Sequence, residues 1–130
     1  MVETLEHEVK TSKGLILVID DNERHLDFIR EVLSEQGYGV KTANSGWKGV
    51  NEYKTEEYNL VVTDYSMPDL SGIDVIQNIL KINPNAKIIL NTVDCSEDIS
   101  EKAKQAGACE VVDKNLHRLM TIINTYARVV

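Results

Sequence analysis

Five short apolar runs, separated by segments with helical periodicity, constrain the fold of this 130-residue chain more than any other feature. Their leucine-rich and β-branched composition is typical of strands buried on both faces of a sheet. Strands that alternate with helices favour a parallel sheet, because each pair of parallel strands needs a crossover connection. The predicted strands are Leu15–Ile19, Val40–Ala43, Leu60–Thr63, Lys87–Leu90 and Cys109–Val112. The sequence therefore predicts an α/β fold.

Amphipathic patterns predict five helices, one after each strand. The first follows the capping candidates Asp21 and Asn22, the second follows Ser45, and the fourth runs from Ser96 to Gly107. The third ends before Pro84, because the residue before a proline avoids the helical region. The apolar positions expected to face the core are Leu26, Ile29 and Leu33, then Trp47, Val50 and Tyr53, then Ile73, Ile76 and Leu80, and finally Leu116, Leu119, Ile123 and Tyr126.

The second strand differs from the others because its apolar and polar residues alternate around Tyr38, Val40 and Thr42. Alternation of this kind favours an edge strand with one solvent-exposed face. With right-handed crossovers, the five units form a doubly wound, flavodoxin-like parallel sheet with strand order 2-1-3-4-5 and five covering helices.

Length and charge limit the domain organisation and the partners. We expect one domain spanning residues 14–130 after a polar N-terminal extension of residues 1–13. The net charge of −7 disfavours direct contact with nucleic acid or with anionic lipid. No apolar run is long enough to span a bilayer, and the polar start does not resemble a signal peptide. Together with two cysteines that lack a metal-binding or redox spacing, these features predict a cytoplasmic protein with no membrane association.

Polar side chains follow four of the five predicted strands. Asp20 and Asp21 follow the first strand, Asp64 the third, Thr92 the fourth and Lys114 the fifth. Taken singly, such residues are more often helix caps, turn residues or solvated side chains. In an open α/β sheet, however, ligands bind at the carboxyl ends of the strands. The joint placement therefore predicts a functional site at this edge.

Three crowded carboxylates raise one another's pKa unless a cation lies among them. Oxygen ligands in a shallow, open site suit Mg²⁺, which keeps several waters and takes one or two carboxylates plus phosphate oxygens. An aspartate is an established nucleophile toward a phosphoryl group. Lys114 and Thr92 supply the positive charge and the hydroxyl donor that phosphoryl transfer needs beside Asp64.

With these residues in place, the chain from about Gly14 to Tyr126 resembles the receiver domains of bacterial response regulators. The family's acidic pair is matched by residues 17–22, which read Leu-Val-Ile-Asp-Asp-Asn. Its phosphoacceptor loop is matched by residues 61–72, which read Val-Val-Thr-Asp-Tyr-Ser-Met-Pro-Asp-Leu-Ser-Gly. The second motif is highly specific. Shorter matches lie at Ser45-Gly46, Ile89-Leu90-Asn91-Thr92 and Ala106-Gly107-Ala108.

The resemblance implies a role for each site residue. The Mg²⁺ ligands are expected to be the side chains of Asp20, Asp21 and Asp64 and the backbone carbonyl of Ser66. Asp64 is also expected to be the phosphoacceptor. Thr92 is expected to be the switch hydroxyl, and Lys114 is expected to contact the phosphate.

The resemblance also implies partners. The phosphoryl group is expected to come from a sensor histidine kinase or a phosphotransfer protein. An output partner is expected to bind the surface of the fourth helix, the fifth strand and the fifth helix, and a homodimer is left open. Such a domain is a signalling element, not an enzyme in the usual sense, although it catalyses its own phosphorylation and dephosphorylation.

Three residues depart from the family pattern. Asn115 stands where proline is usual after the lysine, so we expect Lys114 to be held less rigidly. Val111 replaces the usual aromatic switch residue, so an aromatic rotamer change cannot accompany activation. Val93 replaces a small residue after Thr92, and its bulk is expected to narrow access to the phosphate.

Two rival interpretations follow. These departures favour a pseudo-receiver, an interaction module that is not regulated by phosphorylation, but the intact acidic pair, Asp64, Thr92 and Lys114 argue against it. A hydrolase of the haloacid-dehalogenase kind also uses an aspartyl phosphate, but it needs Asp-x-Asp after the first strand. This chain has Asp20-Asp21-Asn22 there.

Overall fold

A five-stranded parallel sheet forms the centre of the molecule in the computed structural model, which describes residues 13–127. Residues 1–12, nearly all of the predicted extension, and residues 128–130 lie outside the described residues. The strand order is β2-β1-β3-β4-β5, as predicted, with β2 at one edge. The strands are β1 (Leu15–Ile19), β2 (Gly39–Ala43), β3 (Leu60–Thr63), β4 (Ile88–Asn91) and β5 (Glu110–Val112).

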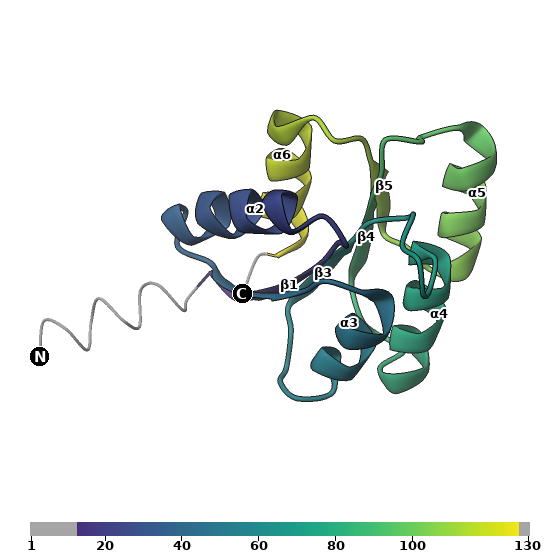
Figure 1. Cartoon of the computed structure of the whole chain (residues 1–130), viewed down its shortest axis with the longest axis horizontal. Helices are drawn as coiled ribbons and strands as arrows, with labels where there is room; N and C mark the ends of the chain where they lie inside the picture. Colours follow the sequence, from purple (N-terminus) through teal and green to yellow (C-terminus); the bar gives the residue numbers. More distant parts are fainter. Residues whose placement is uncertain (1–12, 128–130) are drawn as a thin grey trace, which may run out of the picture.

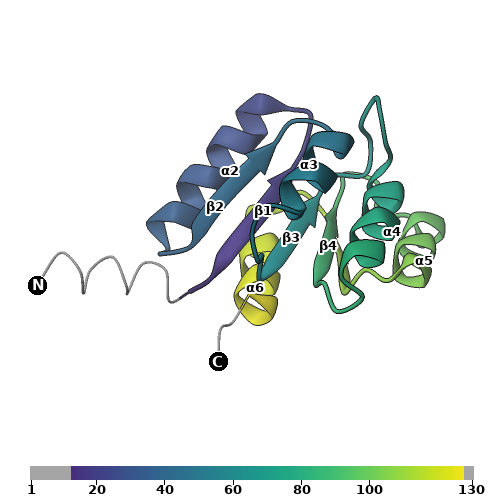
Figure 2. The ribbon, with the colours of Figure 1, turned by 90° about the horizontal axis from the view of Figure 1, so that it is seen from below.

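Helices cover both faces of the sheet (Figures 1 and 2). They are α2 (Glu23–Glu35), α3 (Gly46–Tyr53), α4 (Gly72–Ile82), α5 (Glu97–Ala106) and α6 (Leu116–Tyr126). Strand residues alternate between two cores: Ile16 and Val18 pack with α2 and α6, whereas Leu17 and Ile19 pack with α3, α4 and α5. This burial on both faces confirms the doubly wound α/β fold.

Several local predictions are confirmed. Asn22, Ser45 and Ser96 are N-caps whose side chains each accept a backbone N–H of the first turn. Gly107 ends α5 at φ +113°, in the left-handed region that favours glycine.

The predicted core faces of two helices are wrong in part. The buried face of α4 is Gly72, Val75, Ile76 and Ile79, so Ile73 and Leu80 lie at its margins. In α3, Trp47 is 49 % exposed and the buried face is Gly46, Gly49, Val50 and Tyr53. Both helices approach the sheet through glycines, which a search for large apolar residues overlooks.

Strand register determines which side chains meet at the carboxyl ends of the strands. Ile19 of β1 pairs with Thr63 of β3, and the Asp64 backbone N–H donates to the Ile19 carbonyl at 2.8 Å. Asp20 and Asp64, the next residues of these adjacent strands, are therefore neighbours. Asn91 pairs with Val112, so Thr92 and Lys114 follow at the same edge of the sheet. No helix within residues 13–127 is both long and apolar enough to cross a membrane.

Candidate functional site

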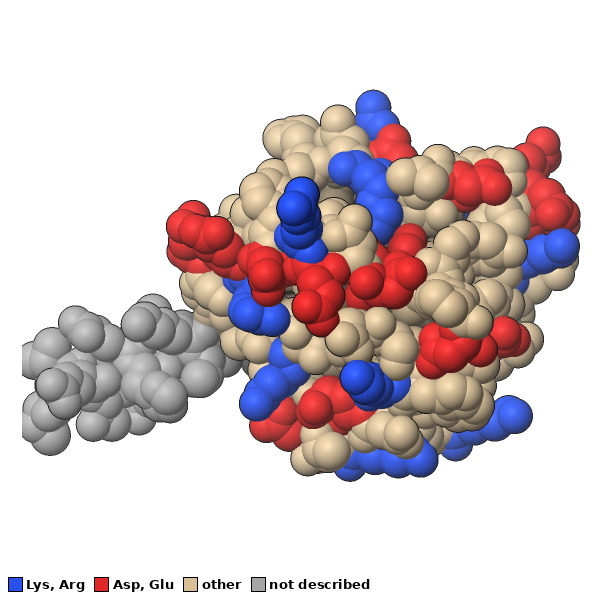
Figure 3. Space-filling model, viewed as in Figure 1, with Lys and Arg blue, Asp and Glu red and all other residues tan. Residues whose placement is uncertain are grey.

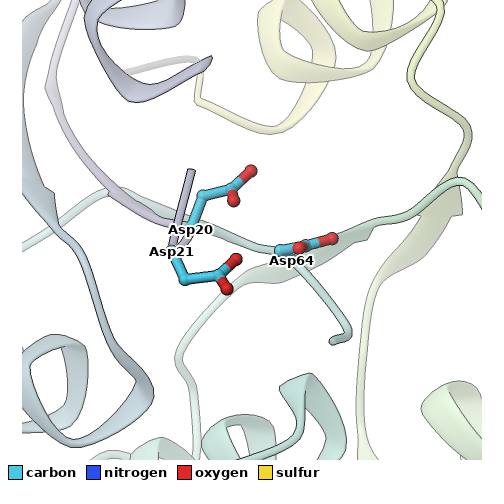
Figure 4. Close-up of side chains that lie close together, drawn as sticks. All are labelled: Asp20, Asp21 and Asp64. Atoms are coloured by element: carbon cyan, nitrogen blue, oxygen red, sulfur yellow. The ribbon is translucent and has the colours of Figure 1, made fainter. Parts of the chain in front are cut away.

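Three aspartates converge at the ends of β1 and β3. One carboxylate oxygen from each of Asp20, Asp21 and Asp64 lies within 4.8 Å of the other two (Figure 4). Asp20 is buried at 3 % exposure, and its Oδ1 accepts the Asn22 backbone N–H at 3.0 Å. Asp21 is exposed and Asp64 is half-buried. Figure 3 shows the molecule from the same side as Figure 1, and acidic side chains gather near the middle of the face that is visible there.

Lys114 bridges two of these carboxylates. Its Nζ lies 3.1 Å from Asp20 Oδ2 and 3.4 Å from Asp64 Oδ1. Burial raises the pKa of Asp64 above its ordinary value, and the Asp20 carboxylate adds to that rise. The Lys114 ammonium opposes both effects and lowers the pKa of Asp64. Lys114 therefore favours the charged form of Asp64.

All six predicted site residues line one cavity of about 450 Å³: Asp20, Asp21, Asp64, Ser66, Thr92 and Lys114. Thr92 is 2 % exposed, and its Oγ1 accepts the Asp94 backbone N–H at 3.1 Å. Val93 is 84 % exposed and belongs to the cavity wall, so it lies at the rim and does not fill the interior.

Two residues near the site escaped prediction. His25 of α2 lines the cavity, and its Nε2 lies 3.8 Å from Asp20 Oδ2. Asn91 is buried, and its amide donates to the carbonyls of Val112 and Asp113, directly before Lys114. His25 has no partner at a recognised motif spacing. Asn91 directly follows the predicted strand Lys87–Leu90 within a matched segment, but nothing in the sequence indicates what its amide contacts.

The donor set fits a hard divalent cation. The clustered groups are all carboxylates, the ligand type that Mg²⁺ prefers, and the cluster opens onto a cavity that has room for water and phosphate oxygens. No cysteine belongs to the cluster, and both cysteines of the chain are free thiols. The arrangement therefore does not fit a closed zinc site with cysteine ligands.

Comparison with known proteins agrees with this geometry. The chain is 33 % identical over 100 residues to the chemotaxis protein CheY of Thermotoga maritima, a match that covers 76 % of this chain and 83 % of that protein. It is 30 % identical to the transcriptional regulatory protein ZraR of Klebsiella oxytoca, over 78 % of this chain but only 23 % of that protein. The relatives thus include both short and much longer proteins.

A solved structure gives a further match. The response regulator TrrA of Thermotoga maritima, determined in complex with Mg²⁺ and beryllium fluoride, is 34 % identical and superposes with a TM-score of 0.79. The match covers 86 % of this chain and 97 % of that one. The family model for the response regulator receiver domain matches residues 16–124. The chain therefore belongs to the response regulator receiver domains of two-component signalling and is CheY-like.

Proposed function

We propose that this receiver domain accepts a phosphoryl group on Asp64 in a Mg²⁺-dependent reaction, from a phosphohistidine of a sensor histidine kinase or phosphotransfer protein. The observation that carries the proposal is the convergence of Asp64 with two further carboxylates and with the Lys114 ammonium at 3.4 Å. The TrrA structure, which holds Mg²⁺ and beryllium fluoride, supports the same chemistry for a relative at 34 % identity.

The transfer is a displacement at phosphorus. A carboxylate oxygen of Asp64 forms a bond to the phosphorus while the phosphorus–nitrogen bond of phosphohistidine breaks. The electron pair of that bond returns to the imidazole, which takes up a proton from solvent. Lys114 stabilises the phosphoryl oxygens by charge, and the Thr92 hydroxyl is the neutral donor on the cavity wall.

The metal would be held by Asp20, Asp21 and Asp64, with the Ser66 backbone carbonyl as a further oxygen ligand. Ser66 lines the same cavity as the three carboxylates, which supports its inclusion. When bound, Mg²⁺ supplies positive charge that compensates both the clustered carboxylates and the phosphoryl oxygens.

The output of the domain is proposed to be a change of the surface formed by α5, β5 and α6, the fourth helix, fifth strand and fifth helix of the sequence prediction. Thr92 connects the site to this surface because its Oγ1 accepts the Asp94 backbone N–H, and the Asp94 carboxylate accepts the Ser96 backbone N–H at 3.0 Å. Ser96 in turn caps α5. The pseudo-receiver alternative is disfavoured because Val93 lies at the cavity rim and leaves the site open.

Intact-mass measurement tests the proposal. Wild-type protein treated with a small phosphodonor and Mg²⁺ is expected to gain the mass of one phosphoryl group, and the gain is expected to vanish without the metal. Asp64→Asn is expected to gain nothing. Asp74→Asn, which alters an exposed carboxylate at the start of α4, is the matched control and is expected to behave as wild type. An unmodified wild type, or equal modification of Asp64→Asn, would contradict the proposal.

A further inference from the structure

Asn91 is one of only four buried residues with a polar or charged side chain among the described residues, at 2 % exposure. It is the last residue of β4, one position before Thr92. Its Nδ2 donates to the Val112 carbonyl at 3.2 Å and to the Asp113 carbonyl at 2.8 Å. A buried amide in a strand is costly unless it is hydrogen-bonded, and here both bonds go to one short stretch of a neighbouring segment.

The two carbonyls that Asn91 contacts lie directly before Lys114. The Val112 carbonyl also accepts the Thr92 backbone N–H at 3.0 Å. Asn91 therefore ties the end of β4, which carries Thr92, to the turn after β5, which carries Lys114. The other bonds of this turn are local: the Asn115 backbone N–H donates to Asp113 Oδ1 at 3.1 Å, and the Arg118 guanidinium donates to Asp113 Oδ2.

We propose that Asn91 is a positioning residue that fixes the Lys114 ammonium over Asp64 and sets its spacing from Thr92. This inference rests on the proposed function, in which Lys114 and Thr92 contact the phosphoryl group. It accounts for how Lys114 reaches Asp20 and Asp64 when Asn115 stands in place of the proline expected after it. The amide takes over part of the restraint that a rigid ring would give, and it acts on the amino-terminal side of Lys114, through the carbonyls of Val112 and Asp113.

Asn91→Leu tests the inference, because leucine keeps the γ-branched shape and removes both donors. The Val112 carbonyl keeps its backbone donor, whereas the Asp113 carbonyl loses the amide. We expect the rate of Asp64 phosphorylation by a small phosphodonor at saturating Mg²⁺ to fall by roughly 10-fold to 100-fold, as for a misplaced catalytic group. Mg²⁺ affinity, measured by calorimetry, is expected to stay within about twofold of wild type, since the three carboxylates remain in place.

A double-mutant cycle separates positioning from general loss of structure. If Asn91 acts through Lys114, Asn91→Leu has no further effect on the rate once Lys114→Ala is present. Asn83→Leu is the matched control, because Asn83 also uses its Nδ2, to the Tyr53 hydroxyl at 3.1 Å, but lies before β4 at the opposite end of that strand. It is expected to lower stability without changing the rate. Asn91→Ser serves if Asn91→Leu does not fold, since its shorter hydroxyl cannot reach both carbonyls.

The outcomes are distinct. A wild-type rate in Asn91→Leu or Asn91→Ser, or an equal rate loss with and without Lys114, would overturn the inference. If wild-type protein is not phosphorylated at all, the proposed function fails, and the inference is then decided by the NMR signals of the Lys114 side chain. These are expected to shift in the Asn91 variant and not in Asn83→Leu, and unshifted signals would overturn the inference.

Discussion

At the scale of single residues, Asp69 shows how a side chain from the loop between β3 and α4 supports a neighbouring helix. Its Oδ1 accepts the Gly46 backbone N–H at 3.0 Å, and its Oδ2 accepts the Trp47 backbone N–H at 2.9 Å. These are free donors of the first turn of α3, where negative charge is favourable. The bond from Trp47 is the main reason that the pKa of Asp69 lies below its ordinary value.

We predict that Asp69→Ala lowers the free energy of unfolding by about 1 kcal/mol at neutral pH, a typical value for the loss of a capping side chain. Because the folded-state pKa is depressed, this stabilisation is present above the unfolded-state pKa and is lost as pH falls through the folded-state pKa. Urea unfolding of wild type and variant at neutral pH and near pH 3 checks this. The exposed Glu57→Ala is the control. A stability difference that persists unchanged in acid would contradict the ionic interpretation.

Gly72 is constrained by its close approach to the backbone of Asp64 and Tyr65. A Cβ at this position would lie 2.3 Å from the Asp64 carbonyl oxygen and 2.9 Å from Tyr65 Cα. Both are backbone atoms, so relieving the clash requires a shift of the main chain. We predict that Gly72→Ala destabilises the fold by about 1–3 kcal/mol, the usual range for overpacking, and slows phosphorylation of Asp64. Urea unfolding and intact-mass kinetics measure the two effects. For comparison, the atom nearest to a Cβ at Gly39 is the flexible end of the Leu15 side chain, at 3.1 Å, and backbone atoms lie no closer than 3.7 Å. A loss of stability in Gly39→Ala as large as that in Gly72→Ala would refute the backbone-clash explanation.

At the scale of elements, the strands, their order and three of the five N-caps followed from the sequence, because burial on both faces and capping leave strong local patterns. Ser71 was missed as the cap of α4, since its partner in the capping box is Asp74, whereas the usual pattern has Glu or Gln. The buried faces of α3 and α4 were misplaced because glycine, at Gly46, Gly49 and Gly72, faces the core. That choice depends on tertiary packing and not on apolar periodicity.

The loop from β4 into α5 is the element expected to switch. Thr92 accepts the Asp94 backbone N–H, so movement of its hydroxyl toward a phosphoryl group disturbs Asp94 and the cap of α5. A full reversal of a two-state equilibrium needs about 5.5 kcal/mol. Two charge-assisted bonds to phosphate, at roughly 1.5–3 kcal/mol each, supply most of this amount, and they supply all of it near the upper end of that range.

We therefore predict that beryllofluoride with Mg²⁺ shifts the amide signals of Thr92 to Ile99, with no aromatic rearrangement at Val111. NMR shift mapping measures this, and Thr92→Val, which loses the hydroxyl, is expected to confine the shifts to the surroundings of Asp64. If the amide signals of Thr92 to Ile99 do not shift in the wild type, the domain binds the phosphate mimic without switching by this route.

At the scale of the whole molecule, the convergence of Asp20, Asp21, Asp64, Thr92 and Lys114 was predictable because parallel strands bring their carboxyl ends to one edge. The restraints on these groups were not predictable. The bonds of Asn91 to the turn before Lys114 and the approach of His25 to Asp20 depend on side-chain directions that only the packed structure fixes. The same packing concentrates negative charge in a chain that already carries a net charge of −7.

A cation that binds only the folded state stabilises it by an amount that grows with the logarithm of the ratio of its concentration to its dissociation constant. We predict that Mg²⁺ at about 100 times its dissociation constant raises the free energy of unfolding by about 2.7 kcal/mol. Asp21→Ala is expected to lose this gain, whereas Asp27→Ala, an exposed aspartate on α2 that pairs with Arg30, is expected to keep it. Thermal unfolding with and without Mg²⁺ decides the matter, and an undiminished gain in Asp21→Ala would mean that Asp21 does not bind the metal.

We predict that Asp64 itself carries the phosphoryl group, and chemical reduction can locate the modified residue. Borohydride reduces an acyl phosphate to an alcohol, so it converts a phosphorylated aspartate into homoserine and leaves free carboxylates unchanged. After reaction with a small phosphodonor and Mg²⁺, peptide mass spectrometry of the reduced protein is predicted to place homoserine at position 64 and nowhere else. Homoserine at position 20 or 21, or its absence from position 64 in protein whose intact mass shows phosphorylation, would show that Asp64 is not the phosphorylated residue.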